Sequence, residues 1–316
     1  MSRHPDIIVV TLNPAIDRTV EVDQMRLGGV VRCRLTLVEP AGKGINVALD
    51  LAALGCRAVA IGFVGRQEAA MFRRAFAGTP VQTDFTLVEG STRVSLTILD
   101  RGASQETHLA EQGFEVSRQA ARRLIAKTRA LARPGAWVCF NGRPAPGFGL
   151  EAYAELLATA KAAGARLLVD TSGDYLPAAL EAKPDFVKPN EEELAELAGR
   201  PLPTPRAVVR AARQVAQKAA HVVVSLGGRG ALAVTPQGAW RAKERVRARV
   251  VHTVGCGDAL ATGYLAGLAS GLPAPEALRL GVACGGACAR TPRAALRSMA
   301  EVEAVRPNVD VTPFAL

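Results

Sequence analysis

The sequence predicts an α/β fold: a three-layer sandwich with a mainly parallel central sheet, plus a small separate β-sheet. Short apolar runs rich in β-branched residues alternate with segments of helical periodicity, as in repeated βαβ units. Two segments interrupt that alternation with polar–apolar alternation around glycine turns. The 316 residues, 49% of them hydrophobic, suffice for one large core, so we expect a single domain over 1–316.

The expected strands of the main sheet are short runs that are apolar on both faces, which is typical of parallel strands covered by helices. They are residues 6–12, 57–65, 136–142, 166–170, 185–190 and 221–228. Apolar spacing predicts helices at 45–55, 68–77, 117–131 and 150–163.

The two interrupting segments, about 18–40 and 92–113, have the pattern of antiparallel hairpins. We expect them to project from the main sheet as a small β-layer. The C-terminal stretch "RPNVDVTPFAL" is expected to be a short closing segment.

The net charge of +10 favours anionic partners, either nucleic acid or small phosphorylated molecules. Basic residues are scattered, however, and aromatic residues make up only 4%, which leaves little for base stacking. We therefore expect a solvated basic surface and no nucleic-acid partner. No apolar run approaches the roughly 18 residues of a membrane span, and the first residues do not resemble a signal peptide. A cytoplasmic protein without a membrane partner is expected.

The cysteines show no CxxC pair and no histidine-rich neighbourhood, so we expect free, buried thiols. They are Cys33, Cys56, Cys139, Cys256, Cys284 and Cys288. Cys284 and Cys288 are spaced to share one helix face, but two ligands do not make a zinc site.

The stretch "TVGCGDALATG" places an acid between two glycines and a helix-compatible run. Gly255 and Gly257 allow the amides up to Asp258 to converge on an anion at a helix start. Asp258 could be a plain N-cap, worth about 1 kcal/mol. It could also accept the proton of an alcohol that attacks a phosphoryl group held by those amides. A Walker A motif and a strand-terminal GxGxxG are both absent.

The stretch "TVGCGDALATGYLAG" closely resembles one signature of the ribokinase-like, or PfkB, carbohydrate kinases, and "AGKGINVALDLAALG" resembles their other signature. "TLNPAID", "GSTRVSLTI", "KPNEEEL" and "SLGGRGAL" follow the family's order across almost the whole chain. The first of these, with "AGKGINVA", is most similar to the sugar-phosphate branch that contains 1-phosphofructokinase, tagatose-6-phosphate kinase and the minor 6-phosphofructokinase. The resemblance implies a ribokinase-like sandwich whose two hairpins form a lid.

By this resemblance the protein is an ATP- and Mg²⁺-dependent kinase of a ketohexose phosphate, with fructose 1-phosphate to fructose 1,6-bisphosphate as the first expectation. Alternatives are a 6-phosphofructokinase, a tagatose-6-phosphate kinase, an unphosphorylated sugar or nucleoside kinase, or a non-catalytic nucleotide-binding regulator. Asp258 would be the general base, and Gly255, Cys256 and Gly257 would form the anion hole. Cys256, where relatives often have alanine or serine, would contribute its amide.

On the substrate side the resemblance implies a set of sugar- and phosphate-binding positions. They are Asp17, Gly42, Lys43, Gly44, Asn46, Arg93 and Arg143. Arg93 would bind the substrate phosphate with its planar guanidinium; the alternative is an exposed strand arginine. Asp17 would accept sugar hydroxyls or merely cap a turn, and 42–46 could be only a structural turn. Arg143 departs from the family's usual "SGSLPPG" pattern.

On the nucleotide side the implied positions are Lys188, Asn190, Ser225, Gly227, Gly230 and Gly286. Asn190 and Glu193 would organise Mg²⁺ through water, because this ion keeps much of its hydration shell. Without the resemblance, "PNEEEL" is an ordinary acidic helix start. Lids of this family often pair edge to edge, so a homodimer is expected.

Overall fold

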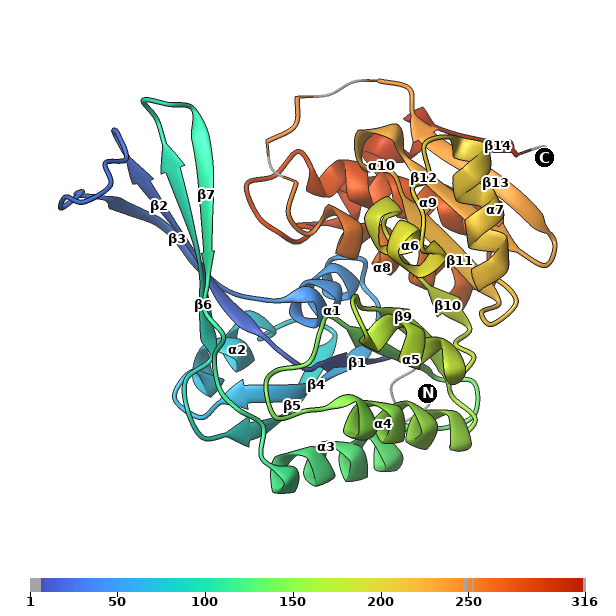
Figure 1. The fold of residues 1–316 in the computed structure, drawn as a ribbon, viewed down its shortest axis with the longest axis horizontal. Helices are drawn as coiled ribbons and strands as arrows, with labels where there is room; N and C mark the ends of the chain where they lie inside the picture. Colours follow the sequence, from blue (N-terminus) through green and yellow to red (C-terminus); the bar gives the residue numbers. More distant parts are fainter. Residues whose placement is uncertain (1–6, 247–248, 252, 315–316) are drawn as a thin grey trace.

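The computed structural model describes residues 7–246, 249–251 and 253–314. Most of the described strands form one ten-stranded sheet (Figure 1). From edge to edge the order is β14 (Val309–Pro313), β13 (Gly238–Glu244), β12 (Ala231–Thr235), β11 (His221–Ser225), β10 (Phe186–Val187), β9 (Arg166–Asp170), β8 (Trp137–Asn141), β1 (Ile7–Thr11), β4 (Ala58–Gly65) and β5 (Val81–Val88). The strands from β11 to β5 are parallel, whereas β12, β13 and β14 add an antiparallel edge.

Every predicted strand of the main sheet is confirmed, although β10 is much shorter than expected. The sheet also contains β5 and the edge strands β12 to β14, which the sequence analysis did not assign as strands. β5 lies at an edge, and its residues alternate between buried and exposed positions instead of forming a continuous buried run. The closing segment contributes β14, which pairs with β13.

Helices cover both faces of the sheet. They are α1 (Lys43–Ala53), α2 (Ala69–Ala75), α3 (Arg118–Leu131), α4 (Leu150–Ala162), α5 (Tyr175–Glu181), α6 (Glu191–Ala198), α7 (Pro205–Val215), α8 (Cys256–Ala269), α9 (Ala274–Cys288) and α10 (Met299–Val305), with 3₁₀ turns η1 (Gly227–Arg229) and η2 (Arg306–Asn308). Side chains of β1 alternate between the layers: Ile7 and Val9 pack with α1, α8 and α9, while Ile8 and Val10 pack with α3 and α4. This confirms the three-layer sandwich. None of the helices in the described ranges is long and apolar enough to span a membrane.

The two predicted hairpins form a second sheet that stands away from the main body (Figure 1). Its order is β3 (Arg34–Ala41), β2 (Ala15–Val22), β6 (Arg93–Asp100) and β7 (Gln105–Ala110). Each hairpin is antiparallel, and the two hairpins join through a parallel pair, β2 with β6. We call this sheet the lid. All of β7 is exposed, so the lid has an uncovered edge.

The prediction that all cysteines are buried is wrong for Cys33, which is exposed because no layer covers the lid hairpin where it lies. Cys56 and Cys256 are half-buried, and only Cys139, Cys284 and Cys288 are fully buried. Within the described part of the chain no disulfide links them.

Candidate active site

Three buried polar residues stand at the carboxyl ends of adjacent central strands. Thr11 of β1 is in register with Asn141 of β8, which is in register with Asp170 of β9. The Thr11 hydroxyl and both amide atoms of Asn141 are buried without a hydrogen-bond partner. Ligands of open α/β sheets bind at this edge, and buried polar groups seldom stay unpaired, so this row is the candidate floor of a binding site.

The glycine turn places Asp258 beside this floor. Gly255 is the N-cap of α8 at φ 80°, and a Cβ there would lie 1.8 Å from the Ala294 carbonyl oxygen. Only glycine fits such a close approach with positive φ. The interpretation of Asp258 as an N-cap is therefore wrong, because Asp258 lies within the first turn of α8. Its Oδ2 instead accepts a hydrogen bond of 2.9 Å from Nδ2 of Asn46 on α1.

Two lysines converge on these carboxylates. Lys43 Nζ lies 3.0 Å from Oδ1 of Asp170 and 3.6 Å from Oδ1 of Asp258. Lys188, only 3% exposed, places Nζ 3.4 Å from Oδ1 of Asp170. A Cβ on Gly257 would lie 3.6 Å from that same Nζ. Lys188 thus holds a positive charge next to the glycine turn.

The charges of this cluster set one another's protonation. Burial and the neighbouring Asp170 raise the pKa of Asp258, although Lys43 and the Asn46 hydrogen bond oppose the shift. Burial also disfavours the charged form of Asp170, but Lys188 and Lys43 outweigh it and lower its pKa. Burial disfavours the Lys43 ammonium, yet Asp170 and Asp258 together raise its pKa. Of the two central aspartates, Asp170 is therefore held in its charged form by the lysines, whereas the pKa of Asp258 is shifted upward, toward easier proton uptake.

The lid supplies residues from the opposite side. Asp17 lies on β2 and Arg93 at the start of β6, in the strand pair that joins the hairpins. Arg93 is half-buried, so it does not match the alternative of an exposed strand arginine. Burial lowers the pKa of Arg93, and the charge of Asp17 opposes that shift. The two side chains thus act on each other electrostatically at the base of the lid.

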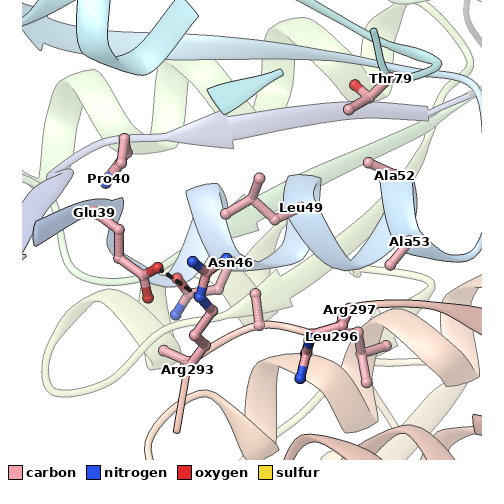
Figure 2. A pocket seen from close by; sticks show the side chains of 12 residues that line it. Glu39, Pro40, Asn46, Leu49, Ala52, Ala53, Thr79, Arg293, Leu296 and Arg297 are labelled. Carbon is pink, nitrogen blue, oxygen red and sulfur yellow. Dashed lines mark ion pairs between the residues drawn. The ribbon is translucent and has the colours of Figure 1, made fainter. Parts of the chain in front are cut away.

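A cavity of about 240 Å³ runs along α1 from Asn46 to Ala53 (Figure 2). On one side stands Glu39 of β3, and opposite it Arg293, whose Nε lies 3.5 Å from Oε2 of Glu39. Burial raises the pKa of Glu39, an effect that Arg293 opposes. This ion pair connects the lid to the segment that packs against Gly255.

The implied magnesium residues Asn190 and Glu193 cap helix α6. Asn190 Oδ1 accepts from the Glu193 amide at 2.7 Å, and Glu193 Oε2 accepts from the Asn190 amide at 2.8 Å, a reciprocal capping box. Burial raises the pKa of Glu193, while Lys188 and Lys43 oppose the shift, so Glu193 shares the field of the central cluster. No group of three or more His, Cys, Asp or Glu side chains suited to a metal occurs in the described ranges.

The implied nucleotide positions fall into two places. Ser225 ends β11 and forms an isolated parallel β-bridge with Asn190. Gly227 and Gly230 follow in the turn to β12. A Cβ on Gly230 would lie 2.0 Å from the Ala242 oxygen, which explains that glycine. Gly286 is separate, on α9, where a Cβ would lie 2.9 Å from Oε2 of Glu244.

Arg143 is exposed just beyond β8 and is not part of the central cluster. A Cβ on Gly173 would lie 3.8 Å from its Cζ, and Arg143 lines a separate open hollow together with Phe148 and Tyr175. The loop 42–46 contributes more than a turn: Gly42 is the N-cap of α1, while Lys43 and Asn46 reach the carboxylates.

Sequence analysis missed Asp170, Asn141 and Thr11. Asp170 ends the predicted strand "RLLVD", whereas Asn141 and Thr11 are the last residues but one of the predicted strands "AWVCFNG" and "DIIVVTL". In the structure each of the three ends its strand. A polar residue at the carboxyl end of a predicted parallel strand was the available signal.

A family model described as pfkB family carbohydrate kinase matches residues 10–300. The chain is 37% identical to 1-phosphofructokinase of Rhodobacter capsulatus over 284 residues, 88% of each chain. It is 32% identical to 1-phosphofructokinase of Escherichia coli strain K12 over 315 residues, 99% of this chain and 100% of the relative. The structure of phosphofructokinase-2 from Escherichia coli in complex with fructose-6-phosphate matches with a TM-score of 0.87 at 30% identity, over 96% of this chain and 98% of that one.

Proposed function

The chain belongs to the pfkB family of carbohydrate kinases, and on that premise we propose that it transfers the γ-phosphoryl group of ATP to fructose 1-phosphate, forming fructose 1,6-bisphosphate. The ribokinase-like α/β fold expected from the resemblance is confirmed, as is a phosphotransferase with a sugar alcohol acceptor. The two sequence relatives carry the name 1-phosphofructokinase. The structural match to phosphofructokinase-2 keeps fructose 6-phosphate as the second candidate.

The observation that carries the proposal is the buried Asp258 beside a glycine turn. Its Oδ2 accepts from Asn46, which orients the carboxylate, and Oδ1 lies toward Lys43. In the proposed reaction a carboxylate oxygen accepts the proton of the substrate hydroxyl as that oxygen attacks phosphorus. The raised pKa of Asp258 makes it a better proton acceptor than a solvated aspartate.

The turn stabilises the charge that develops on the transferred group. Gly255 is the N-cap of α8, and Cys256 and Gly257 are its first two residues, so the proposed anion hole lies where the helix dipole favours an anion. Lys188 adds a fixed ammonium beside Gly257, and Asp170 holds that ammonium in place. Preorganised charge of this kind costs no reorganisation during the reaction.

We assign Mg²⁺ to water-mediated contacts near Asn190 and Glu193. The donor set fits this mode, because one oxygen of each side chain already serves the capping box and the described residues hold no larger cluster of ligands. A magnesium ion held there would supply positive charge that offsets the charge of the phosphates. Ser225, Gly227 and Gly230, which share the turn next to Asn190, would lie along the nucleotide, and Gly286 would lie beside its base.

On the acceptor side, the unpartnered groups of Thr11 and Asn141 are suited to sugar hydroxyls, together with Asp17. Arg93 would bind the phosphate that the substrate already carries. Its burial matters, because a guanidinium shielded from water binds phosphate more strongly than an exposed one. Arg143, exposed outside the cluster, would at most add long-range attraction for an anionic substrate.

We also propose that the lid pairs with the lid of a second copy. Leu27 and Val30 are 94% and 99% exposed, Leu35 and Leu109 are 58% and 53% exposed, and β7 has an unpaired edge. Light scattering would give a dimer mass for the wild type and a monomer mass for Leu109→Lys. Val246→Lys, at an apolar position outside the lid that is 54% exposed, is the matched control. A wild-type monomer would contradict the proposal.

We expect the protein to act in the cytoplasm, where ATP and sugar phosphates are available.

The function is tested by ADP release from Mg-ATP with fructose 1-phosphate, fructose 6-phosphate, tagatose 6-phosphate, fructose and adenosine at equal concentrations. We expect the highest kcat/KM for fructose 1-phosphate. A preference for fructose 6-phosphate would mean that the proposed substrate is wrong and that the proposed phosphoryl transfer still holds. A preference for an unphosphorylated acceptor would overturn the role given to Arg93.

A further inference from the structure

Two thiols meet at the anion hole. Cys256 is the first residue of α8, directly between Gly255 and Gly257, and Cys288 is the last residue of α9. Cys256 and Cys288 interact through their side chains although they are 32 positions apart. The helices are close here, because a Cβ on Gly285, one turn before Cys288, would lie 3.2 Å from the Cys256 carbonyl oxygen. Cys256 is half-buried and reachable from solvent, whereas Cys288 is fully buried.

Cys288 also contacts the backbone around the glycine turn. Its Sγ lies 3.9 Å from the carbonyl oxygen of Val254, next to Gly255, and 3.9 Å from that of Arg293. The next carbonyl along, that of Ala294, is the one that packs against Gly255. The Cys288 sulfur therefore lies between the segments on both sides of the anion hole.

We propose that Cys256 is an oxidation site at which a hydroperoxide switches the kinase off, with Cys288 as the resolving thiol. This inference rests on the proposed function for its effect on activity, but the chemistry of the thiol pair is independent of it. The described chain offers a primary thiol with solvent access and a second thiol already in contact, the arrangement that favours disulfide formation over further oxidation.

The environment of Cys256 supports its role as the attacking sulfur. The hydrogen bond from Cys288 lowers the pKa of the Cys256 thiol, although burial and the Asp258 charge oppose the shift. The start of α8 also favours a thiolate. By contrast, that same hydrogen bond and burial raise the pKa of Cys288, so it stays protonated until it is used.

The reaction balances with hydrogen peroxide as oxidant. The Cys256 thiolate attacks one peroxide oxygen, the O–O bond breaks, and the leaving hydroxide takes the original thiol proton to give water and a sulfenic acid. The Cys288 sulfur then attacks the Cys256 sulfur, the S–O bond breaks, and the departing hydroxyl takes the Cys288 proton as a second water. Two electrons pass from the thiols to the peroxide.

Oxidation would disable the site for a structural reason. A disulfide removes the single Cys288 S–H proton, so this sulfur can no longer donate to either of the carbonyl oxygens near it, those of Val254 and Arg293. It also ties the first residue of α8 to α9. Because Ala294 touches Gly255 with no space to spare, a shift of this segment displaces the amides that hold the phosphoryl group.

The test treats the full-length protein with hydrogen peroxide and then measures ADP release and non-reduced tryptic peptides. We expect at least a tenfold loss of activity, recovery with dithiothreitol, and a disulfide joining peptides 250–279 and 280–290. Cys288→Ala should abolish that cross-link and leave a sulfenic acid on Cys256 that dimedone traps. Cys33→Ser, which removes the exposed lid thiol, should behave as the wild type, and Cys284→Ala should keep the cross-link.

Loss of activity without the cross-linked peptides would overturn the inference, as would equal peroxide sensitivity in Cys256→Ser. Absence of both the cross-link and the dimedone adduct would overturn it as well. If the untreated protein phosphorylated none of the tested acceptors, the proposed function would fail, yet the peptide masses would still decide whether the thiol pair forms.

Discussion

The two sides of the candidate active site are built differently. The cluster around Asp170 and Asp258 is buried and joined by ion pairs and hydrogen bonds, with Lys188 only 3% exposed. The lid side carries apolar residues in water, such as Leu27 at 94% exposed, and its Glu39–Arg293 ion pair is partly solvated. The side chains of the cluster are thus held in place by contacts within one chain. The conformation of the lid, by contrast, depends on the substrate or partner molecule that it contacts. Substitutions in the cluster should therefore lower kcat, and substitutions in the lid should weaken substrate affinity.

The largest effect is expected from Asp258→Asn. Without the proton acceptor, kcat should fall by about 10² to 10⁴-fold, the usual contribution of a general base. ATP binding, measured by calorimetry, should stay unchanged because the amides of the turn are retained. Asp310→Asn, at an exposed position on β14, is the control and should keep full activity. Near-normal turnover of Asp258→Asn would contradict the proposal that Asp258 is the general base.

The buried ion pairs predict a strong effect of Asp170→Ala on folding. Two lysines would lose the carboxylate that neutralises them, which typically costs about 3 to 5 kcal/mol when a buried pair is broken. Urea unfolding measures this change. Asp84→Ala removes the partner of Lys127 at the surface, where about 0 to 1 kcal/mol is expected. Equal losses in the two variants would mean that the cluster is not specially stabilised.

For the lid, Arg93→Ala should raise KM for the sugar phosphate by roughly tenfold to a hundredfold, the value of a charged hydrogen-bonding contact. The effect on kcat should be small, because the proposed role of Arg93 is to bind the phosphate that the substrate already carries and not the reacting hydroxyl. Arg101→Ala, which removes a lid arginine paired with Glu21, is the matched control. Steady-state kinetics would contradict the assignment if kcat fell while KM stayed constant.

A finer test uses Lys43→Met and the pH dependence of kcat/KM. Lys43 counteracts the raised pKa of Asp258, so its removal should raise that pKa further. Activity is lost as the base is protonated, and the acidic limb of the profile should therefore move to higher pH. Lys161→Met, which removes a surface partner of Asp185, should leave the profile unmoved. A shift toward lower pH would reverse the sign of the proposed coupling.

The sequence by itself determined the features that depend on neighbouring residues. The periodicity of "DIIVVTL" and "RLLVD" predicted buried parallel strands, and glycine turns between alternating residues predicted both lid hairpins. The two glycines of "TVGCGDALATG" predicted a turn at the start of a helix, and the structure places it at Gly255. Local backbone preference and the pattern of burial are sufficient for such features.

Only the tertiary structure decided which distant groups meet. Lys43 and Asp170 are 127 positions apart, and Asn46 and Asp258 are 212 apart, so no local pattern could show that Asp170 neutralises the cluster. The contact between Cys256 and Cys288 depends on how α8 packs against α9. Burial and long-range charge, rather than residue type, decide whether an aspartate is a proton acceptor, an ion-pair partner or a cap. For that reason the sequence could single out Asp258 as the proposed base, while its contacts with Asn46 and Lys43 became visible only in the folded chain.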